Sequence, residues 1–188
     1  MISHKDAGLI KGSEFAMETY TGKHIDIWAM KEEDIDLVDI AHHLSLICRF
    51  GGACKEFYSV GQHSLLVREL VVNASADKMT QLTALLHDAA EAYIGDLIRP
   101  LKYTQPKLIE LEKRIMGTIS KKFGISGGDY ELVNKMDDVA LAIEARQLVL
   151  GWQSWNLPDI TNINIEISED FPQVVENKFI GTYKALRS

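Results

Sequence analysis

The sequence predicts an all-α fold with at most one small two-stranded β ribbon. Apolar residues recur at three- and four-residue spacing in several segments, most of which begin or end at a capping residue, a proline or a glycine. A strand–helix alternation is absent from the pattern, which excludes a doubly wound nucleotide-binding fold. The 188 residues, 46% of them hydrophobic and 25% charged, suffice for a single domain around one sizeable core.

The first half of the chain predicts one weak strand and three helices. Residues 25–28 alternate between apolar and polar side chains, as in a strand. Asp34 is the expected N-cap of the first helix, and Gly51 and Gly52 end it. Gly95 follows the third helix. The apolar faces of the three helices are, in order, Leu37, Ile40, Ala41, Leu44, Ile47 and Cys48; Val60, Ser64, Val67 and Val71; and Leu82, Leu85, Leu86, Ala89, Ala90 and Tyr93.

Three more helices are expected after the break at Arg99 and Pro100. Thr104 is a plausible cap for the first of them, with Pro106 near its first turn and Gly124 at its end. The other two are expected over about residues 129–150 and from about residue 172. Between these two, Ile163, Ile165 and Ile167 alternate with polar residues and predict a strand that pairs with residues 25–28.

The composition excludes several classes of function. A net charge of −7 gives no basic surface for a nucleic acid polymer, although one positive pocket suffices for a single nucleotide. The sequence contains neither a run of about 18 apolar residues nor a secretory signal, so we expect a cytoplasmic protein without a membrane partner. Cys48 and Cys54 lack metal-ligand spacing, so we expect reduced thiols. Both the P-loop and the dinucleotide-binding glycine motif are absent.

Residues 1–16 are expected to be a tag or leader, and residues 17–188 a single domain. The stretch Gly12-Ser13-Glu14-Phe15 resembles a cloning-site scar, which would make Met17 the natural start. The rest of the chain has no internal repeat and no linker long enough to divide it into domains.

The most informative segment is LLHDAAEAYIGDLIRPLK, over residues 85–102. His87 and Asp88 are adjacent, and Glu91 follows four residues after His87, so a continuous helix puts His87 and Glu91 on one face. Asp96 comes just beyond Gly95. These groups and Lys102 lie among Leu, Ala, Ile and Tyr, whereas a solvated face would show Glu and Lys interspersed over several turns. A solvated face nevertheless remains the alternative for this cluster.

Two other segments hold further candidate ligands. His63 lies beside the apolar face of its expected helix, where a lone histidine is more often a core residue than a metal ligand. Asp137 and Asp138 precede an apolar run, and an Asp pair near a helix start usually compensates the helix dipole. Helical spacing does not separate Asp137 from Asp138.

Joined, these segments supply two histidines and two aspartates from three helices. Imidazole and carboxylate together suit a divalent ion such as Mn, Co, Zn, Fe, Ni or Mg. A bound cation makes water acidic enough to attack a phosphoester, and Glu91 or Asp96 could move its proton. Arg49 or Lys102 could neutralise the phosphate oxygens.

At this point the sequence resembles the HD-domain metal-dependent phosphohydrolases, most closely their short phage and prophage-type branch. The segments that resemble this family are DIAHHLSLICRFGGACKEFYSVGQHS, LLHDAAEAYIGDLIRPLK and DDVALAIEARQL. They occur in the family's order and spacing between about residues 22 and 150. A single His-Asp doublet is a weak signal, but the ordered set is a strong one. The resemblance implies an HD-domain helical bundle.

The resemblance also implies a role for individual residues. Asp137 is preferred over Asp138 because it stands seven residues before Glu144, with Arg146 following. Glu91 and Asp96 are the implied catalytic carboxylates. Arg49 and Lys102 are the implied phosphate-binding cations, and Phe50 lies where a sugar or base could pack, although a core Phe is the more frequent explanation. The implied metal ligands are His63, His87, Asp88 and Asp137.

Two features depart from the family's pattern. Many relatives have a histidine directly after the paired glycines, where this chain has Ala53, so the choice of substrate is open. His42 and His43 are extra imidazoles, which we interpret as surface or helix-packing residues.

The family resemblance implies hydrolysis of deoxynucleotides by water attack at the α-phosphorus, in a bacterial or phage-infected cell. Two reactions remain open: a 5′-deoxynucleotidase, and a deoxynucleoside triphosphohydrolase of the dATP-removing phage type. A triphosphate needs more cationic contacts, for which Lys102, Arg99 and Lys55 are candidates. The alternative is a catalytically inactive nucleotide-binding regulatory HD module. A homo-oligomer is expected by analogy alone.

Overall fold

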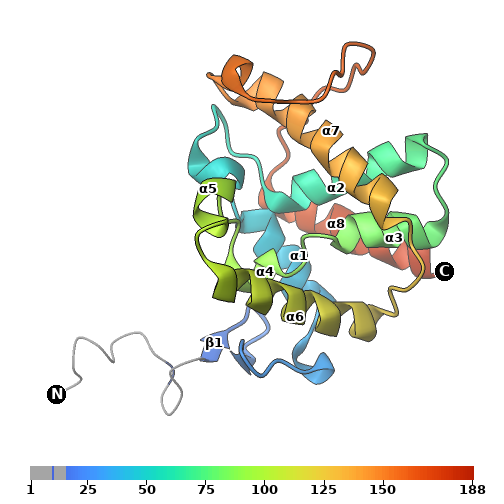
Figure 1. The fold of residues 1–188 in the computed structure, drawn as a ribbon. Coiled ribbons are helices and arrows are strands. Elements are labelled where there is room, and N and C mark those ends of the chain that lie inside the picture. The colour runs from blue at the N-terminus through green and yellow to red at the C-terminus, as the bar shows by residue number, and fades with distance from the viewer. Residues whose placement is uncertain (1–9, 11–15) are drawn as a thin grey trace.

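A computed structural model of the protein describes residue 10 and residues 16–188 (Figure 1). It confirms the all-α fold with a small β ribbon. The expected tag over residues 1–16 lies, except for Ile10 and Ala16, outside the described residues. The α-helices are α1 (Leu37–Leu46), α2 (Val60–Asn73), α3 (Lys78–Leu86), α4 (Glu91–Ile94), α5 (Arg99–Lys102), α6 (Pro106–Phe123), α7 (Tyr130–Leu148) and α8 (Pro172–Arg187). Short 3₁₀ helices cover Glu32–Asp34, Arg49–Gly52 and Trp152–Ser154.

The ribbon forms near the N-terminus, and its predicted partner was wrong. Strand β1 (Ala16–Glu18) pairs antiparallel with β2 (His24–Asp26), with Met17 opposite Ile25. The segment with Ile163, Ile165 and Ile167 instead lies against the second hydrophobic cluster, at α2 and α7. There the Gln147 side chain makes the two backbone hydrogen bonds that a paired strand would make. Its amide N–H donates to the Ile165 carbonyl, and its amide oxygen accepts from the Ile167 N–H.

Helix α1 begins later and ends earlier than the sequence predicted. Its N-cap is Asp36, whose side chain accepts from the Val38 N–H, whereas Asp34 belongs to the preceding 3₁₀ turn. After Leu46 the chain is extended at Ile47 and Cys48, before the 3₁₀ turn Arg49–Gly52. Tertiary pairing causes this, since the segment at Cys48 forms a β-bridge with Ser59.

The expected third helix is broken at the His-Asp doublet. Helix α3 ends at Leu86, a tight turn follows, and α4 restarts at Glu91. The carbonyl of Ala84 would accept from the Asp88 N–H in a continuous helix, but it lies 2.8 Å from Nδ1 of His87. His87 and Glu91 therefore do not share the face of one continuous helix, as the spacing had suggested.

The later helices follow the sequence more closely. Helix α6 has Pro106 at its first position and ends at Gly124, which adopts the left-handed conformation with φ of 61°. Its N-cap is Gln105 rather than Thr104. Helix α7 begins after Asp129, whose side chain accepts from the Leu132 N–H.

Helix α2 is central, because α1, α3, α7 and α8 all pack against it. At Gly61 its backbone comes so near its neighbours that an added Cβ would lie 2.9 Å from Val175 Cγ1 and 3.3 Å from the Leu44 backbone. Only glycine fits at this close approach. The close approach therefore helps to fix the position of α2, and with it the position of His63, two residues later.

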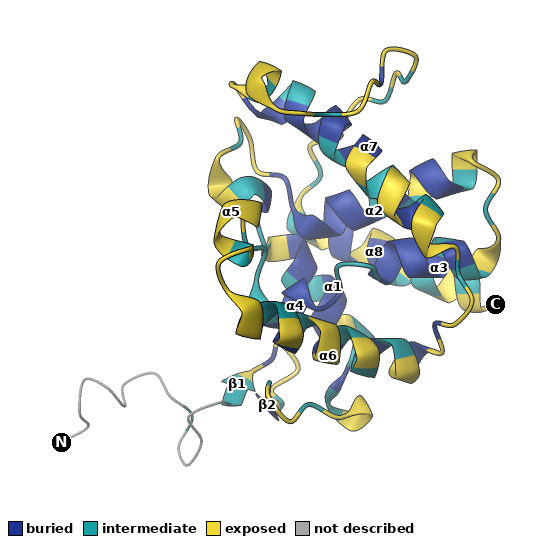
Figure 2. Cartoon of the chain, in the orientation of Figure 1, coloured by how far each residue is buried: buried dark blue, intermediate teal, exposed yellow. Residues whose placement is uncertain are grey.

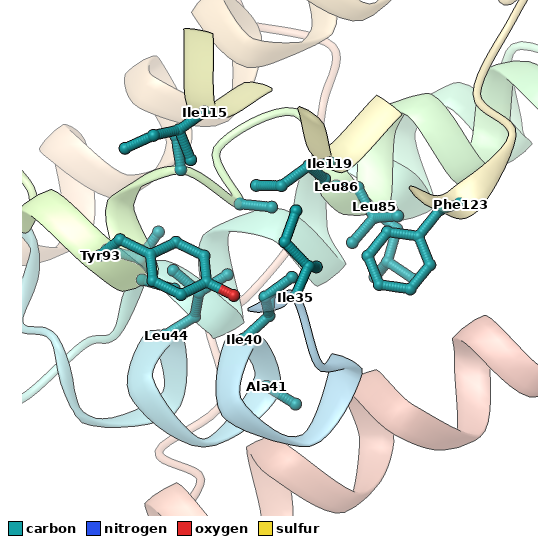
Figure 3. Close-up of a cluster of buried hydrophobic side chains, with 14 of the residues drawn as sticks. Ile35, Ile40, Ala41, Leu44, Leu85, Leu86, Tyr93, Ile115, Ile119 and Phe123 are labelled. Carbon is teal, nitrogen blue, oxygen red and sulfur yellow. The ribbon is translucent and has the colours of Figure 1, made fainter. Parts of the chain in front are cut away.

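The core consists of two clusters of buried apolar side chains. Figure 2 shows that the helices bury one side and expose the other. In the larger cluster, side chains from α1, α3 and α6 point toward one another, among them Leu44, Leu86 and Ile119 (Figure 3). The smaller cluster joins α2 to α7 through residues such as Val67 and Ile143. In the part of the chain that the structure describes, no helix is both long and apolar enough to cross a membrane.

Helix α8 is fastened to the core by Phe179, whose side chain is fully buried. We expect Phe179→Ala to lower the free energy of unfolding by about 3–5 kcal/mol, because it leaves a cavity. The matched control is Phe171→Ala, at a side chain that is 79% exposed, where the change should stay within about 0.5 kcal/mol. Urea unfolding followed by circular dichroism measures both. Equal losses in the two variants would contradict this account of the packing.

Candidate metal centre

Three parts of the chain bring two histidines and two aspartates together. His63 comes from α2, His87 and Asp88 from the turn between α3 and α4, and Asp137 from α7. From His63 Nε2, the distances are 3.3 Å to His87 Nε2, 3.4 Å to Asp88 Oδ2 and 3.0 Å to Asp137 Oδ1. His87 Nε2 lies 3.2 Å from Asp88 Oδ2 and 3.9 Å from Asp137 Oδ1. His63, His87 and Asp88 form a group that could hold a metal ion, and Asp137 lies beside it.

Asp137 and Asp138, which helical spacing did not separate and of which the motif resemblance preferred Asp137, have different surroundings. Both lie in the middle of α7, so helix-dipole compensation at a helix start does not explain them. The Asp137 carboxylate points to the two imidazoles. The Asp138 carboxylate is 60% exposed and lies 3.6 Å from the Arg99 guanidinium.

His63 is fully buried, but its surroundings are not purely apolar. Its Nδ1 lies 2.7 Å from Glu144 Oε1, and Glu144 Oε2 accepts from the Arg49 guanidinium at 2.9 Å. Burial raises the pKa of the Glu144 carboxyl, but the charges of His63 and Arg49 outweigh it and lower the pKa overall. Glu144 is therefore an anion that holds the Nδ1 proton of His63, which turns Nε2 toward the aspartates.

The sequence pointed to Glu144 as a motif position without a role of its own. The signal was present in its spacing from Asp137. Seven residues are close to two helical turns, so the two carboxylates project from the same side of α7.

The second imidazole is oriented in the same way by a backbone group. Nδ1 of His87 faces the Ala84 carbonyl, which can only accept, so Nδ1 carries the proton. Both histidines thus direct Nε2 lone pairs at each other and at two carboxylates. Desolvation lowers the pKa of His87, but the Asp88 charge outweighs it and raises that pKa, and the pKa of His63 is raised well above its usual value. The cluster requires a positive charge at its centre, either a proton or a cation.

Glu91 lies next to this cluster with its side chain almost wholly buried. Burial, followed by the charges of Asp88 and Asp96, raises the pKa of Glu91 to about 9. Its Oε2 has no hydrogen-bond partner among the described residues. Burial together with the Asp88 charge also raises the pKa of Asp96. The charge of Asp88 thus acts on both predicted catalytic carboxylates, which places them near the candidate ligands.

The predicted substrate residues are already engaged with other groups. Arg49 is buried, pairs with Glu144 and lies 4.0 Å from Asp88. Lys102 donates to Glu112 at 2.7 Å, so its charge is largely compensated. The ring of Phe50 lies 5.4 Å from the Arg49 guanidinium and 6.0 Å from the Trp155 ring. A phosphate at Arg49 or Lys102 would have to share the cation with these acidic partners.

His42 and His43 are packing residues, as the sequence interpretation proposed. His42 stacks on Tyr20, with ring centroids 3.5 Å apart, and its Nδ1 lies 3.0 Å from Glu176 Oε2. Nδ1 of His43 lies 2.8 Å from the Ala92 carbonyl, and its Nε2 accepts from the Tyr20 N–H.

The raised pKa of Glu91 makes the metal-free protein sensitive to pH. The unfolded chain ionises this group above about pH 4.5, but the folded chain does so only at about pH 9. Its stabilising contribution is thus complete below pH 4.5 and is lost as the pH rises to about 9. We expect Glu91→Gln, which stays neutral, to be more stable than the native chain in EDTA by about 1–3 kcal/mol near pH 8 and by clearly less near pH 5.

Urea unfolding at the two pH values measures this difference. The exposed Glu131→Gln makes the same chemical change on α7 and should alter the stability little at either pH. A Glu91→Gln effect that does not depend on pH would contradict the raised pKa.

Comparison with known proteins relates the chain to two bacterial sequences. No family model matches it. It is 39% identical over 134 residues to the uncharacterized protein YfdR of Escherichia coli (strain K12), covering 71% of this chain and 72% of YfdR. It is 34% identical over 137 residues to an uncharacterized protein of Rhodobacter capsulatus, covering 68% of this chain and 70% of that protein. The chain therefore belongs to the same family as YfdR.

Proposed function

We propose that the protein is a metal-dependent phosphohydrolase of deoxynucleotides, of the HD-domain type that its motifs resemble. The observation that supports this most is the convergence of two imidazole Nε2 atoms and two carboxylate oxygens from three separate parts of the fold. These four groups repel one another unless a cation or protons lie between them. Only His63 is fully buried, whereas His87, Asp88 and Asp137 are partly accessible, so a cation from solution can reach the cluster.

The spacing of His63, His87 and Asp88 suits a single divalent ion, and Asp137 lies 3.0 Å from His63 Nε2 and 3.9 Å from His87 Nε2. Atoms about 2.1 Å from one ion lie about 3.0 Å apart at right angles and about 3.4 Å apart at the tetrahedral angle. The separations of 3.0–3.4 Å from His63 Nε2 to its three neighbours agree with this range. Mixed imidazole and carboxylate donors suit Mn, Co, Zn, Fe or Ni, with Mg a further candidate.

The neighbouring residues have the chemistry that hydrolysis needs. His63, His87, Asp88 and Asp137 would hold a divalent cation, which would supply the Lewis acidity that makes water a nucleophile near neutral pH. A divalent cation close to Glu91 would favour its ionised form, in which it accepts the proton of the attacking water. Asp96, whose charge acts on Glu91, orients the water. The cationic Arg49 faces the phosphate oxygens while Glu144 keeps it in position.

The deoxynucleotide substrate and the α-phosphorus as the point of attack rest on the motif resemblance. Phe50, beside Arg49, offers an aromatic face to a sugar or base. The pairing of Lys102 with Glu112 leaves fewer free cations for a long phosphate chain, which favours a deoxynucleoside monophosphate over a triphosphate.

The adjacent aspartates of α7 provide a test of the metal site. We expect Asp137→Asn to weaken the binding of Mn²⁺ at least about 10-fold, because it removes a charged ligand. Asp138→Asn, the same change one residue further at a carboxylate that is 60% exposed, should bind Mn²⁺ like the native chain. Isothermal titration calorimetry of the metal-free protein measures both. Equal affinities in the two variants would exclude Asp137 as a ligand.

The reaction itself is tested with Mn²⁺ or Co²⁺ and a panel of deoxynucleoside mono- and triphosphates. Free phosphate with nucleoside identifies a 5′-deoxynucleotidase, and triphosphate with nucleoside identifies a triphosphohydrolase. We expect Glu91→Gln to retain the metal but to lower turnover about 100-fold or more.

Two results would overturn parts of this proposal. A Glu91→Gln variant with full turnover would exclude Glu91 as the proton acceptor. Nucleotide binding without turnover under any metal would exclude catalysis and favour a regulatory nucleotide-binding module instead.

A further inference from the structure

The two cysteines of the chain are neighbours in space as well as in sequence. Sγ of Cys48 lies 3.6 Å from Sγ of Cys54, and both side chains are partly accessible. The thiols therefore point at each other in van der Waals contact. The sequence contains no other cysteine.

The segment between the two thiols is the 3₁₀ turn Arg49–Gly52, which has an unusual backbone. Phe50 and Gly51 both have φ of 59°, in the left-handed region, and Gly52 has φ of 82°. For Phe50 this conformation costs free energy, because its Cβ crowds the backbone. The surroundings must hold the turn in place, and the pairing of Arg49 with Tyr58 and Glu144 does so.

We propose that Cys48 and Cys54 form a reversible intramolecular disulfide that closes the turn carrying Arg49. With glutathione disulfide as the oxidant, one cysteine thiolate attacks and releases one glutathione, and the second cysteine displaces the other. An S–S bond forms between Cys48 and Cys54, the two thiol protons are released to glutathione thiolates, and the glutathione disulfide is reduced to two glutathione molecules.

The geometry favours this ring over a stable mixed disulfide. Once one cysteine is linked to glutathione, the other is already in contact with it, so the intramolecular step requires little ordering of the chain. Burial and the contact with Cys48 raise the pKa of the Cys54 thiol, which lowers the thiolate fraction and slows the reaction. An equilibrium experiment therefore tests the pair better than a rate.

The disulfide does not depend on the proposed phosphohydrolase function, because no metal ligand takes part. The turn that the disulfide would close contacts the candidate metal site through Arg49. The guanidinium of Arg49 neutralises Glu144, which lies beside His63. A mass measurement can thus succeed or fail independently of any hydrolysis assay.

The test equilibrates the full chain with buffers of increasing glutathione disulfide to glutathione ratio, quenches with acid, and labels remaining thiols with N-ethylmaleimide. We expect the native chain to change from two labels to none, with a mass about 2 Da below that of the unlabelled reduced protein and full return on reduction. Cys48→Ser and Cys54→Ser lack a partner thiol, so each should show one label or one bound glutathione. Circular dichroism checks that both variants fold.

Two results would overturn the proposal. One is a native chain that keeps two labels at the most oxidising ratio. The other is a native chain that accumulates bound glutathione to the same extent as the single-cysteine variants, since a juxtaposed second thiol would have displaced it. A peptide map that links Cys48 to Cys54 within one molecule supports it independently of the variants.

Discussion

The candidate site depends on one buried network of ion pairs and hydrogen bonds, which runs from Arg49 through Glu144 to His63. Glu144 is wholly removed from water, so it is stable as an anion only because a guanidinium and an imidazole pair with it on either side. In return it determines which nitrogen of His63 carries the proton. The network joins the turn after α1, the first turn of α2 and the C-terminal part of α7, so its geometry depends on all three.

The fold class and most helices followed from the sequence because each has a local cause. Capping residues, a proline and a glycine bound α6 and α7, and the spacing of apolar residues marked the buried faces. The motifs brought His63, His87, Asp88 and Asp137 into one hypothesis. What they do chemically was implied by resemblance alone, and the structure adds distances and burial to that hypothesis.

The errors arose where a distant contact overrides a local pattern. Alternation at Ile163 and Ile165 is the same whether the neighbour is a strand or the side chain of Gln147, so periodicity could not identify the partner. The break after Leu86 results from the His87 ring reaching a carbonyl, which residue spacing does not reveal. The acidic partners of Arg49 and Lys102 lie far away in the sequence or on another helix, so residue spacing did not reveal them.

Helix α7 carries Asp137, Glu144 and Gln147, and this limits how the chain can vary in length. Asp137 and Glu144 lie about 10 Å apart along one rigid rod, and each residue turns the helix by about 100°. One residue inserted between them would swing Asp137 away from the imidazoles while Glu144 stayed in place. Insertions after Leu148, in the irregular segment before α8, do not change the relative orientation of Asp137 and Glu144 around the axis of α7. Length variation in this protein is therefore tolerable beyond α7 but not within the two turns that separate its carboxylates.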